Sequence, residues 1–322
     1  MRIYCLELKR ILKTRTTIVL LAAALLLSAW MAYLPITFEE FDYVNAEGKE
    51  IKLKGRKALE YDKELEKEYT GTVTTDKIEK ALRTYQENIK KYGDIYSDDF
   101  PRYISVEQML PTYSLTKRIG ENYADPKSGM AAEITSLDPE EMQSFYKQCK
   151  IHLKDLMNME QSEHPNAKKQ AMKIFENVDM PYSYYPGYGS NSIDYLTLYL
   201  YVLVFITALI AAPVFSSEYQ TGADDILRCT RHGRTRLAVV KTLSVLTICI
   251  VTFGICLTVH TVIANTLFGW ECRKTSMQIL YSVVSLWNLN LGQMQNLTIA
   301  AGFLTMIATI CFVLLLSANS KT

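Results

Sequence analysis

The apolar residues of this chain are concentrated in four windows that contain no Asp, Glu, Lys or Arg. A bilayer core about 30 Å thick is crossed by a helix of about 20 predominantly apolar residues, and every window contains such a run. We therefore predict four transmembrane helices, because four uncharged helices of this length are not expected in a water-soluble domain. The windows are residues 16–38, 195–217, 242–270 and 275–320.

Averages over the whole chain hide this pattern. The 35 Lys and Arg residues almost balance the 34 Asp and Glu residues, so the net charge is +1, and the mean hydropathy is +0.01. Seven Cys in 322 residues are too few for a disulfide scaffold, and an apolar content of 49% excludes a disordered chain. The balanced charge gives no support for nucleic-acid binding, so we expect no nucleic-acid partner.

Basic residues precede the first window and separate the second from the third. Residues 1–15 contain five Arg or Lys and one Glu, and residues 228–241 contain five more Arg or Lys and no acid. Short basic segments of polytopic proteins face the cytoplasm, which predicts a multi-pass plasma-membrane protein with a cytoplasmic N-terminus. A retained first helix is favoured over a cleaved signal peptide, because Trp30 to Pro35 offers no small-residue cleavage site.

Aromatic residues near the window ends are predicted to anchor the helices at the outer membrane interface, where amphipathic rings prefer to lie. His260 lies far enough along its helix from Lys241 to be placed near the same interface. The uncharged segment after Lys274 is rich in Asn and Gln, which leaves open whether this extracellular loop forms a re-entrant or interfacial helix. The predicted anchors are Trp30, Tyr33, Tyr195, Tyr199 and Trp270.

The long hydrophilic insert at residues 36–194 is predicted to be a mostly helical extracellular domain. As far as residue 191 it holds 22 basic and 28 acidic side chains, a net charge of −6, and long loops cross the membrane regardless of their charge. Thr74 and Gly93 are typical of the start and stop of a helix between them. Further helices are predicted over residues 136–160 and 165–178.

Motifs that carry enzyme chemistry are missing from the sequence. There is no G-x-x-x-x-G-K-[ST] loop for ATP, no H-E-x-x-H, no paired C-x-x-C, and the four His residues have no ligand spacing. We therefore expect a chain that is not an enzyme and has no catalytic site, metal or cofactor of its own. Cys149 and Cys272 lie on the predicted outer side. The sequence leaves two alternatives open for them, a disulfide bridge between the two or two free thiols.

Residues 216–241, SSEYQTGADDILRCTRHGRTRLAVVK, are the most informative stretch between the predicted spans. Ser217 and Gln220 fit a helical capping box, and Glu218 suits the first turn of a helix. Apolar side chains then recur at helical spacing. The pattern predicts a short amphipathic helix along the inner membrane face, whereas a plain connecting loop would need neither this length nor a cap.

This stretch resembles the membrane subunits of the type-2 ABC exporter family, in which the segment after the second span is a coupling helix that docks on a separate ATPase. The N-terminal residues 6–13, LELKRILK, resemble the elbow helix of that family, and a large outer domain between the first two spans resembles a subgroup found in Gram-positive bacteria. The matching residues of the coupling pattern are Phe215, Ser216, Glu218, Tyr219, Gly222, Leu227, Arg234 and Lys241.

The resemblance implies the permease subunit of an ATP-driven exporter in a bacterial plasma membrane. It implies two protein partners in the lipid bilayer: an ABC ATPase subunit, which would hold ATP and Mg, and a second permease subunit, identical or different. The residues implied to couple the chain to the ATPase are Glu218, Tyr219, Gly222, Ile226, Leu227 and Arg234.

Permeases of this family usually have six spans, whereas four are predicted here. The resemblance therefore implies either a chain truncated after its fourth span, which we favour, or a shortened variant. The alternative function is a membrane receptor or sensor whose extracellular domain binds a ligand. The sequence does not indicate the transported substrate.

The predicted fold is an all-α polytopic membrane protein with one large hydrophilic domain. Its predicted parts are a cytoplasmic interfacial elbow helix (1–15), transmembrane helix 1 (16–35), the extracellular helical domain (36–194), transmembrane helix 2 (195–215), a cytoplasmic coupling segment (216–241), transmembrane helix 3 (242–268), an extracellular loop (269–296), transmembrane helix 4 (297–317) and a cytoplasmic end (318–322).

Overall fold

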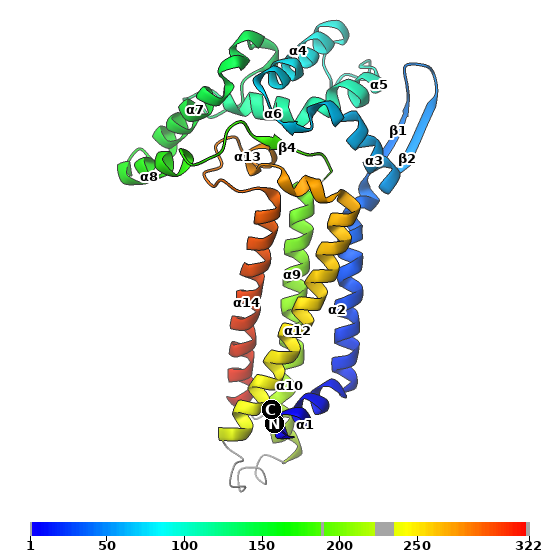
Figure 1. The fold of residues 1–322 in the computed structure, drawn as a ribbon, viewed down its shortest axis with the longest axis vertical. Coiled ribbons are helices and arrows are strands. Elements are labelled where there is room, and N and C mark those ends of the chain that lie inside the picture. The colour runs from blue at the N-terminus through cyan, green and yellow to red at the C-terminus, as the bar shows by residue number, and fades with distance from the viewer. Residues whose placement is uncertain (1, 188–189, 223–234, 320–322) are drawn as a thin grey trace. The chain divides into compact units, whose positions relative to one another are not determined.

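The computed structural model describes residues 2–187, 190–222 and 235–319, and the chain divides into two compact units (Figure 1). The first unit, here called the bundle, consists of Met1–Pro35, Asn191–Leu267 and Gln295–Thr322. The second unit, here called the hydrophilic domain, consists of Ile36–Ser190 and Phe268–Met294.

Long apolar helices make up the bundle. Four of the described helices are long and apolar enough to cross a membrane, which confirms the prediction of four such helices. The helices of the bundle, including the short α1 and α10, are α1 (Arg2–Leu12), α2 (Arg15–Tyr33), α9 (Ser190–Ala211), α10 (Pro213–Thr221), α12 (Thr235–Phe268) and α14 (Leu291–Asn319).

Among the four helices that are long enough to cross a membrane, α9 has the largest buried fraction and α14 the smallest. Half of the most apolar window of α9 is buried, against 17% of the corresponding window of α14. Helix α14 approaches α9 at Gly302, where an added Cβ would lie 2.7 Å from a methyl group of Leu200. A small residue at this position lets the two backbones come close, as is usual between membrane helices.

The hydrophilic domain is built from short helices and two small two-stranded sheets. Its elements, beginning with η1 at the boundary with the bundle, are η1 (Leu34–Phe38), β1 (Glu40–Val44), β2 (Glu50–Lys54), α3 (Arg56–Leu65), η2 (Lys67–Tyr69), β3 (Gly71–Thr72), α4 (Thr75–Tyr92), α5 (Arg102–Ile104), η3 (Ser105–Met109), η4 (Leu110–Thr112), α6 (Tyr113–Asn122), η5 (Ile134–Ser136), η6 (Pro139–Ser144), α7 (Phe145–Glu160), α8 (Pro165–Phe175), β4 (Ser183–Tyr184), η7 (Trp270–Lys274) and α13 (Met277–Leu280).

Helix α4 has the ends that its sequence predicts. The Thr74 hydroxyl accepts a hydrogen bond from the Lys77 amide at 3.4 Å, and Gly93 ends the helix with a φ of 85°. A left-handed φ favours glycine because no Cβ is present to clash with the backbone. Ile78, Ala81 and Leu82 of this helix are buried in the domain core.

The prediction of a mostly helical insert did not include the β1–β2 hairpin. Strands β1 and β2 pair antiparallel, with Phe41 opposite Leu53 and Tyr43 opposite Ile51. The alternation of apolar and charged residues on both strands is the signal for it, since side chains of a strand alternate between two faces. The description of the fold as all-α is therefore too strict for this domain.

The segment at residues 269–296, where the sequence left open a re-entrant or interfacial helix, contains only short helices before α14 begins at Leu291. Its helix α13 has only four residues, and Ile279 and Val283 pack in the core of the hydrophilic domain. The Tyr182 hydroxyl donates a hydrogen bond to the Val283 carbonyl at 2.9 Å. Tertiary packing against the insert accounts for the mixed apolar and amide composition that suggested an interface.

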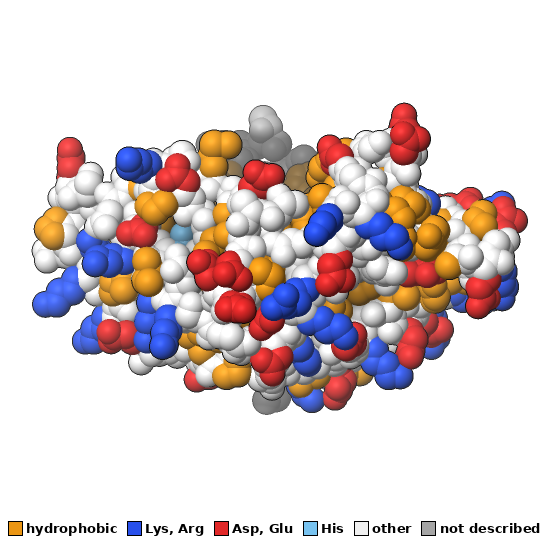
Figure 2. All heavy atoms as spheres, turned by 90° about the horizontal axis from the view of Figure 1, so that it is seen from above, with side chains coloured by type: hydrophobic (Ala, Val, Ile, Leu, Met, Phe, Trp, Pro, Cys, Tyr) orange, Lys and Arg blue, Asp and Glu red, His pale blue; other side chains and the backbone are white. Residues whose placement is uncertain are grey.

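Charged side chains of both signs are interspersed on the face of the molecule seen in Figure 2. Several of them form exposed ion pairs along single helices of the hydrophilic domain, such as Arg56 with Glu60 and Arg83 with Glu79. Exposed pairs of this kind contribute little to stability, on the order of 0.5 kcal/mol each. The stability of this domain therefore rests on its apolar core, which includes Phe145, Phe175 and Tyr182.

Candidate functional site

The predicted coupling segment begins with a helix that follows a break at proline. Helix α9 ends at Ala211, and α10 starts at Pro213, whose lack of an N–H is tolerated in the first turn of a helix. Ser217 therefore lies inside α10 and is not its N-cap, so the capping box predicted for Ser217 and Gln220 is wrong. The sequence pattern resembled a cap, but proline had already started the helix one turn earlier.

A serine from a distant helix supplies the missing cap. The Ser317 hydroxyl of α14 accepts hydrogen bonds from the amides of Phe215 and Ser216, both at 3.2 Å, and donates to the Ala212 carbonyl at 2.6 Å. The first amides of a helix have no partner within the helix, and a hydroxyl is a preferred acceptor for them. The start of α10 is thus fixed directly to the end of α14.

The two ends of the predicted coupling pattern also contact each other. The Lys241 ammonium of α12 lies 5.3 Å from the centre of the Phe215 ring, and only 1% of Lys241 is exposed. A cation over an aromatic ring is attracted by the electrons of its face. Phe215 and Lys241 were both part of the motif, but their contact could not be read from the motif.

The elbow helix α1 is fixed to α12 and faces α10. The Tyr4 hydroxyl donates a hydrogen bond to the Thr247 hydroxyl at 2.8 Å. A cavity of about 260 Å³ separates the α1–α2 corner from the α9–α10 corner, with Arg10 and Thr14 on one wall and Pro213 and Ser217 on the other. Helix α10 therefore has the ends of three other bundle helices around it.

The structure describes only three of the six predicted coupling residues. Glu218 and Tyr219 belong to α10, and Gly222 follows that helix as an exposed residue with a φ of 68°. Among the described residues, no atom lies within 4 Å of the position that a Cβ on Gly222 would take. The remaining predicted residues, Ile226, Leu227 and Arg234, lie outside the described residues, as does Gly233.

The predicted interface anchors divide into exposed and buried rings. Trp30, Tyr33 and Trp270 are 56%, 47% and 50% exposed, and Tyr195 is partly buried. Tyr199 is fully buried, and its hydroxyl donates to the Ala24 carbonyl at 3.0 Å. Its assignment as an anchor is therefore wrong, because the ring faces the interior of the bundle.

His260 is likewise a buried bundle residue and not the interface residue that we expected. Its ring stacks on Tyr199 with centroids 5.1 Å apart, and its Nδ1 lies 3.2 Å from the Ser28 carbonyl oxygen. The stacking places the two rings at the same height in the bundle, whereas distance along the helix predicted a position for His260 alone. It could not reveal which face of each helix meets its neighbours.

The hydrophilic domain contains a buried acid, Glu66, close to the half-buried Asp62, and sequence reasoning missed both. Glu66 is 7% exposed, and the Tyr184 hydroxyl donates to its Oε2 at 2.7 Å. Burial, reinforced by the neighbouring charge of Asp62, raises the pKa of Glu66 to about 8. Burial and the charge of Glu39 raise the pKa of Asp62 to about 6. Asp62 and Glu66 follow the buried Leu59 at helical spacing, which is the signal that they share its face.

The two cysteines of this domain are free and buried. Burial raises the pKa of Cys149 to about 12 and that of Cys272 to about 11. A thiol with so high a pKa is almost wholly protonated at neutral pH and is therefore a poor nucleophile and metal ligand. Among residues 2–187, 190–222 and 235–319, no group of three or more His, Cys, Asp or Glu is arranged to hold a metal ion.

No known protein family, curated protein or solved structure matches this chain.

Proposed function

We propose that this chain is the permease subunit of an ATP-driven ABC exporter. In this proposal the hydrophilic domain lies outside the cell, and α1 and α10 lie at the cytoplasmic face of the plasma membrane of a bacterium. A separate ABC ATPase subunit, which binds ATP and Mg, docks on residues 216–241. A second permease subunit completes the translocation path.

The observation that carries the proposal is the fixation of α10 to two other membrane helices. Ser317 joins the first turn of α10 to α14, and Lys241 joins Phe215 to α12. Pro213 interrupts the helix between α9 and α10, so the axes of the two helices can differ. A plain connecting loop needs none of these contacts, whereas a segment that transmits force needs all of them.

The mechanism that follows is a rigid-body switch between two arrangements of the spans. When the ATPase subunits close on ATP, they displace the coupling segment. Because α10 is bonded to α14 and contacts α12, its displacement moves these helices together with α9. Packed helices change between discrete arrangements instead of deforming continuously, so access to the path would change from one side to the other.

We assign coupling to Glu218 and Gly222, and docking on the ATPase to Tyr219, Ile226, Leu227 and Arg234. Gly222 ends α10 in a left-handed conformation with open space around it. A residue at this position is therefore restricted by its backbone and not by crowding. Valine is strongly disfavoured at such a φ, whereas asparagine adopts it readily.

The test compares Gly222→Val with Gly222→Asn in the complex of the full chain with its ATPase. We expect Gly222→Val to lose most of the transport-linked ATP hydrolysis, and Gly222→Asn to retain it, with equal membrane insertion of both variants. Glu218→Ala should lose coupling in the same assay. Unchanged coupling in Gly222→Val and Glu218→Ala would refute the assignment and favour the receptor function.

A further inference from the structure

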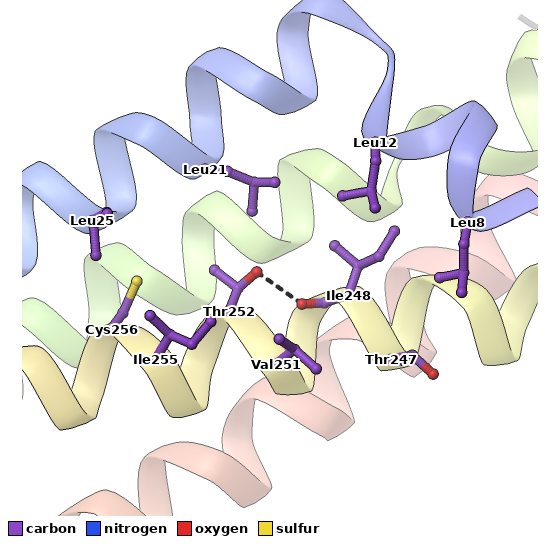
Figure 3. A pocket seen from close by; sticks show the side chains of 10 residues that line it. All are labelled: Leu8, Leu12, Leu21, Leu25, Thr247, Ile248, Val251, Thr252, Ile255 and Cys256. Carbon is purple, nitrogen blue, oxygen red and sulfur yellow. Dashed lines mark hydrogen bonds between the residues drawn. The ribbon is translucent and has the colours of Figure 1, made fainter. Parts of the chain in front are cut away.

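An apolar groove runs along the bundle between α1, α2 and α12. Its volume is about 400 Å³. Figure 3 shows Leu8 and Leu12 of α1 and Leu21 and Leu25 of α2 pointing toward the side chains of α12. The α12 wall consists of Thr247, Ile248, Val251, Thr252, Ile255 and Cys256.

The groove is open to the surroundings of the bundle. Leu25, Val251 and Ile255 are 43%, 53% and 54% exposed although they line it. Exposed apolar surface of this size on a water-soluble protein marks an interaction site. On helices that cross a membrane, the surroundings are hydrocarbon, and an open groove there is filled by a chain of the same chemistry.

The two hydroxyl groups in the lining already have partners. Thr252 donates to the Ile248 carbonyl at 2.8 Å, as Figure 3 shows. Thr247 donates to the Leu243 carbonyl at 2.8 Å and accepts from Tyr4. A polar ligand would therefore lose its bonds to water and gain few in the groove, which disfavours it.

The charge at one end of the groove identifies the kind of apolar occupant. Helix α1 contributes Leu8 and Leu12 to the lining, and the next residues, Lys9 and Lys13, are exposed. Arg2 and Arg15 are exposed as well, and Glu7 is the single acid of residues 1–15. Basic side chains beside an apolar surface attract lipids that carry a negative headgroup.

We propose that the groove between α1, α2 and α12 binds one acyl chain of an anionic glycerophospholipid, whose headgroup lies at the basic residues of α1. The site depends on the membrane-spanning character of the bundle and not on the exporter function. The lipid would fix α1 against α2 and α12, together with the Tyr4–Thr247 hydrogen bond.

The experiment measures lipid binding to the full chain by native mass spectrometry in detergent. The purified, delipidated chain is titrated with phosphatidylglycerol or with phosphatidylcholine that has the same acyl chains. We expect phosphatidylglycerol to bind about 25-fold more tightly, because Lys9 and Lys13 each contribute on the order of a fivefold preference for anionic lipid. Lys9→Gln with Lys13→Gln should remove most of that preference.

Filling the groove provides the second part of the experiment. Leu25→Trp from the α2 wall and Val251→Trp from the α12 wall should each weaken phosphatidylglycerol binding by roughly tenfold or more, because buried methylene groups drive acyl-chain binding. The matched control is Leu26→Trp, since Leu26 is 72% exposed and is not part of the lining. Circular dichroism checks that all three variants are folded.

Three results would overturn the proposal. The first is equal phosphatidylglycerol binding in Leu25→Trp, Val251→Trp and Leu26→Trp. The second is equal binding of the two lipids by the unmodified chain. The third is a dimer of the chain that is lost only in the two groove variants, which would show that a second copy covers the groove.

Discussion

The bundle and the hydrophilic domain place the same kinds of side chains in opposite environments. In the bundle, Leu26, Phe205 and Leu304 are 72%, 65% and 68% exposed. In the hydrophilic domain, Phe145, Phe175 and Tyr182 are at most 1% exposed, and charged side chains cover much of the surface. Burial removes apolar surface from water only where water is the solvent, so each unit is arranged for a different solvent.

This difference explains the near-zero averages of the chain. The net charge of +1 and the mean hydropathy of +0.01 combine a charge-rich domain with four uncharged sequence windows. Neither number describes either unit. Composition therefore becomes informative about this protein only after the chain has been divided at residues where the charge pattern changes.

The largest expected effect is on the free energy of unfolding, when one aromatic ring is removed from each of the two units. Phe145→Ala should lower the free energy of unfolding of the hydrophilic domain by about 3–5 kcal/mol, because it removes a buried ring and leaves a cavity. Phe205→Ala removes a ring of the bundle that is 65% exposed, and it should change stability by less than about 1 kcal/mol. Urea unfolding of the full chain in detergent measures both. Equal losses would mean that the ring of Phe205 is covered by protein.

A smaller effect is expected on how the stability of the hydrophilic domain changes with pH. The pKa of Glu66 is about 8 in the folded domain and 4.5 as its ordinary value. The folded state therefore keeps the proton while the unfolded state loses it, so Glu66 lowers stability progressively as the pH rises from 4.5 to 8. His152 changes the stability in the opposite direction. Burial lowers its pKa, so its contribution to stability increases as the pH rises.

Comparison with Glu66→Gln isolates the contribution of Glu66. The Tyr184 hydroxyl can still donate to the amide oxygen of the variant. We expect the stability advantage of Glu66→Gln to grow by roughly 1 kcal/mol for each pH unit between 5 and 7. Glu64→Gln is the control, because Glu64 lies two residues before Glu66, at the end of α3, and pairs with Lys67 at the surface. An advantage that does not change with pH would contradict the raised pKa.

The smallest effect is expected at the cap of α10. Ser317→Ala removes the acceptor of the Phe215 and Ser216 amides, a loss of about 1 kcal/mol for a helix cap. Hydrogen exchange of these two amides should accelerate about fivefold, while exchange in the middle of α9 stays the same. Unchanged exchange at both amides would show that α10 does not depend on α14.

The sequence predicts the bundle well because each span is specified by its own residues. Twenty consecutive apolar residues require a helix in a membrane wherever the neighbouring helices lie. The ends of α4 are predicted for a similar reason, since Thr74 and Gly93 act on the backbone next to them. These predictions depend on short stretches of chain and not on tertiary contacts.

The parts that sequence reasoning missed depend on residues far apart in the chain. The Ser317 cap lies 102 residues from Phe215, and Tyr199 and His260 are buried because they face each other in the bundle. Burial of Glu66 likewise depends on Tyr184, 118 residues away. The β1–β2 hairpin is different, because its alternation was present in the sequence and was overlooked.

The proposed coupling of this chain to an ATPase is tested most directly by ATP hydrolysis of the isolated complex. The full chain is purified from its native membrane in mild detergent, and the hydrolysis rate is compared for the unmodified chain, Gly222→Val and Gly222→Asn. We predict that an ABC ATPase subunit is present at a fixed stoichiometry, and that Gly222→Val alone uncouples its hydrolysis from transport. A purified chain without an associated ATPase, or equal coupled hydrolysis in all three proteins, would contradict the account.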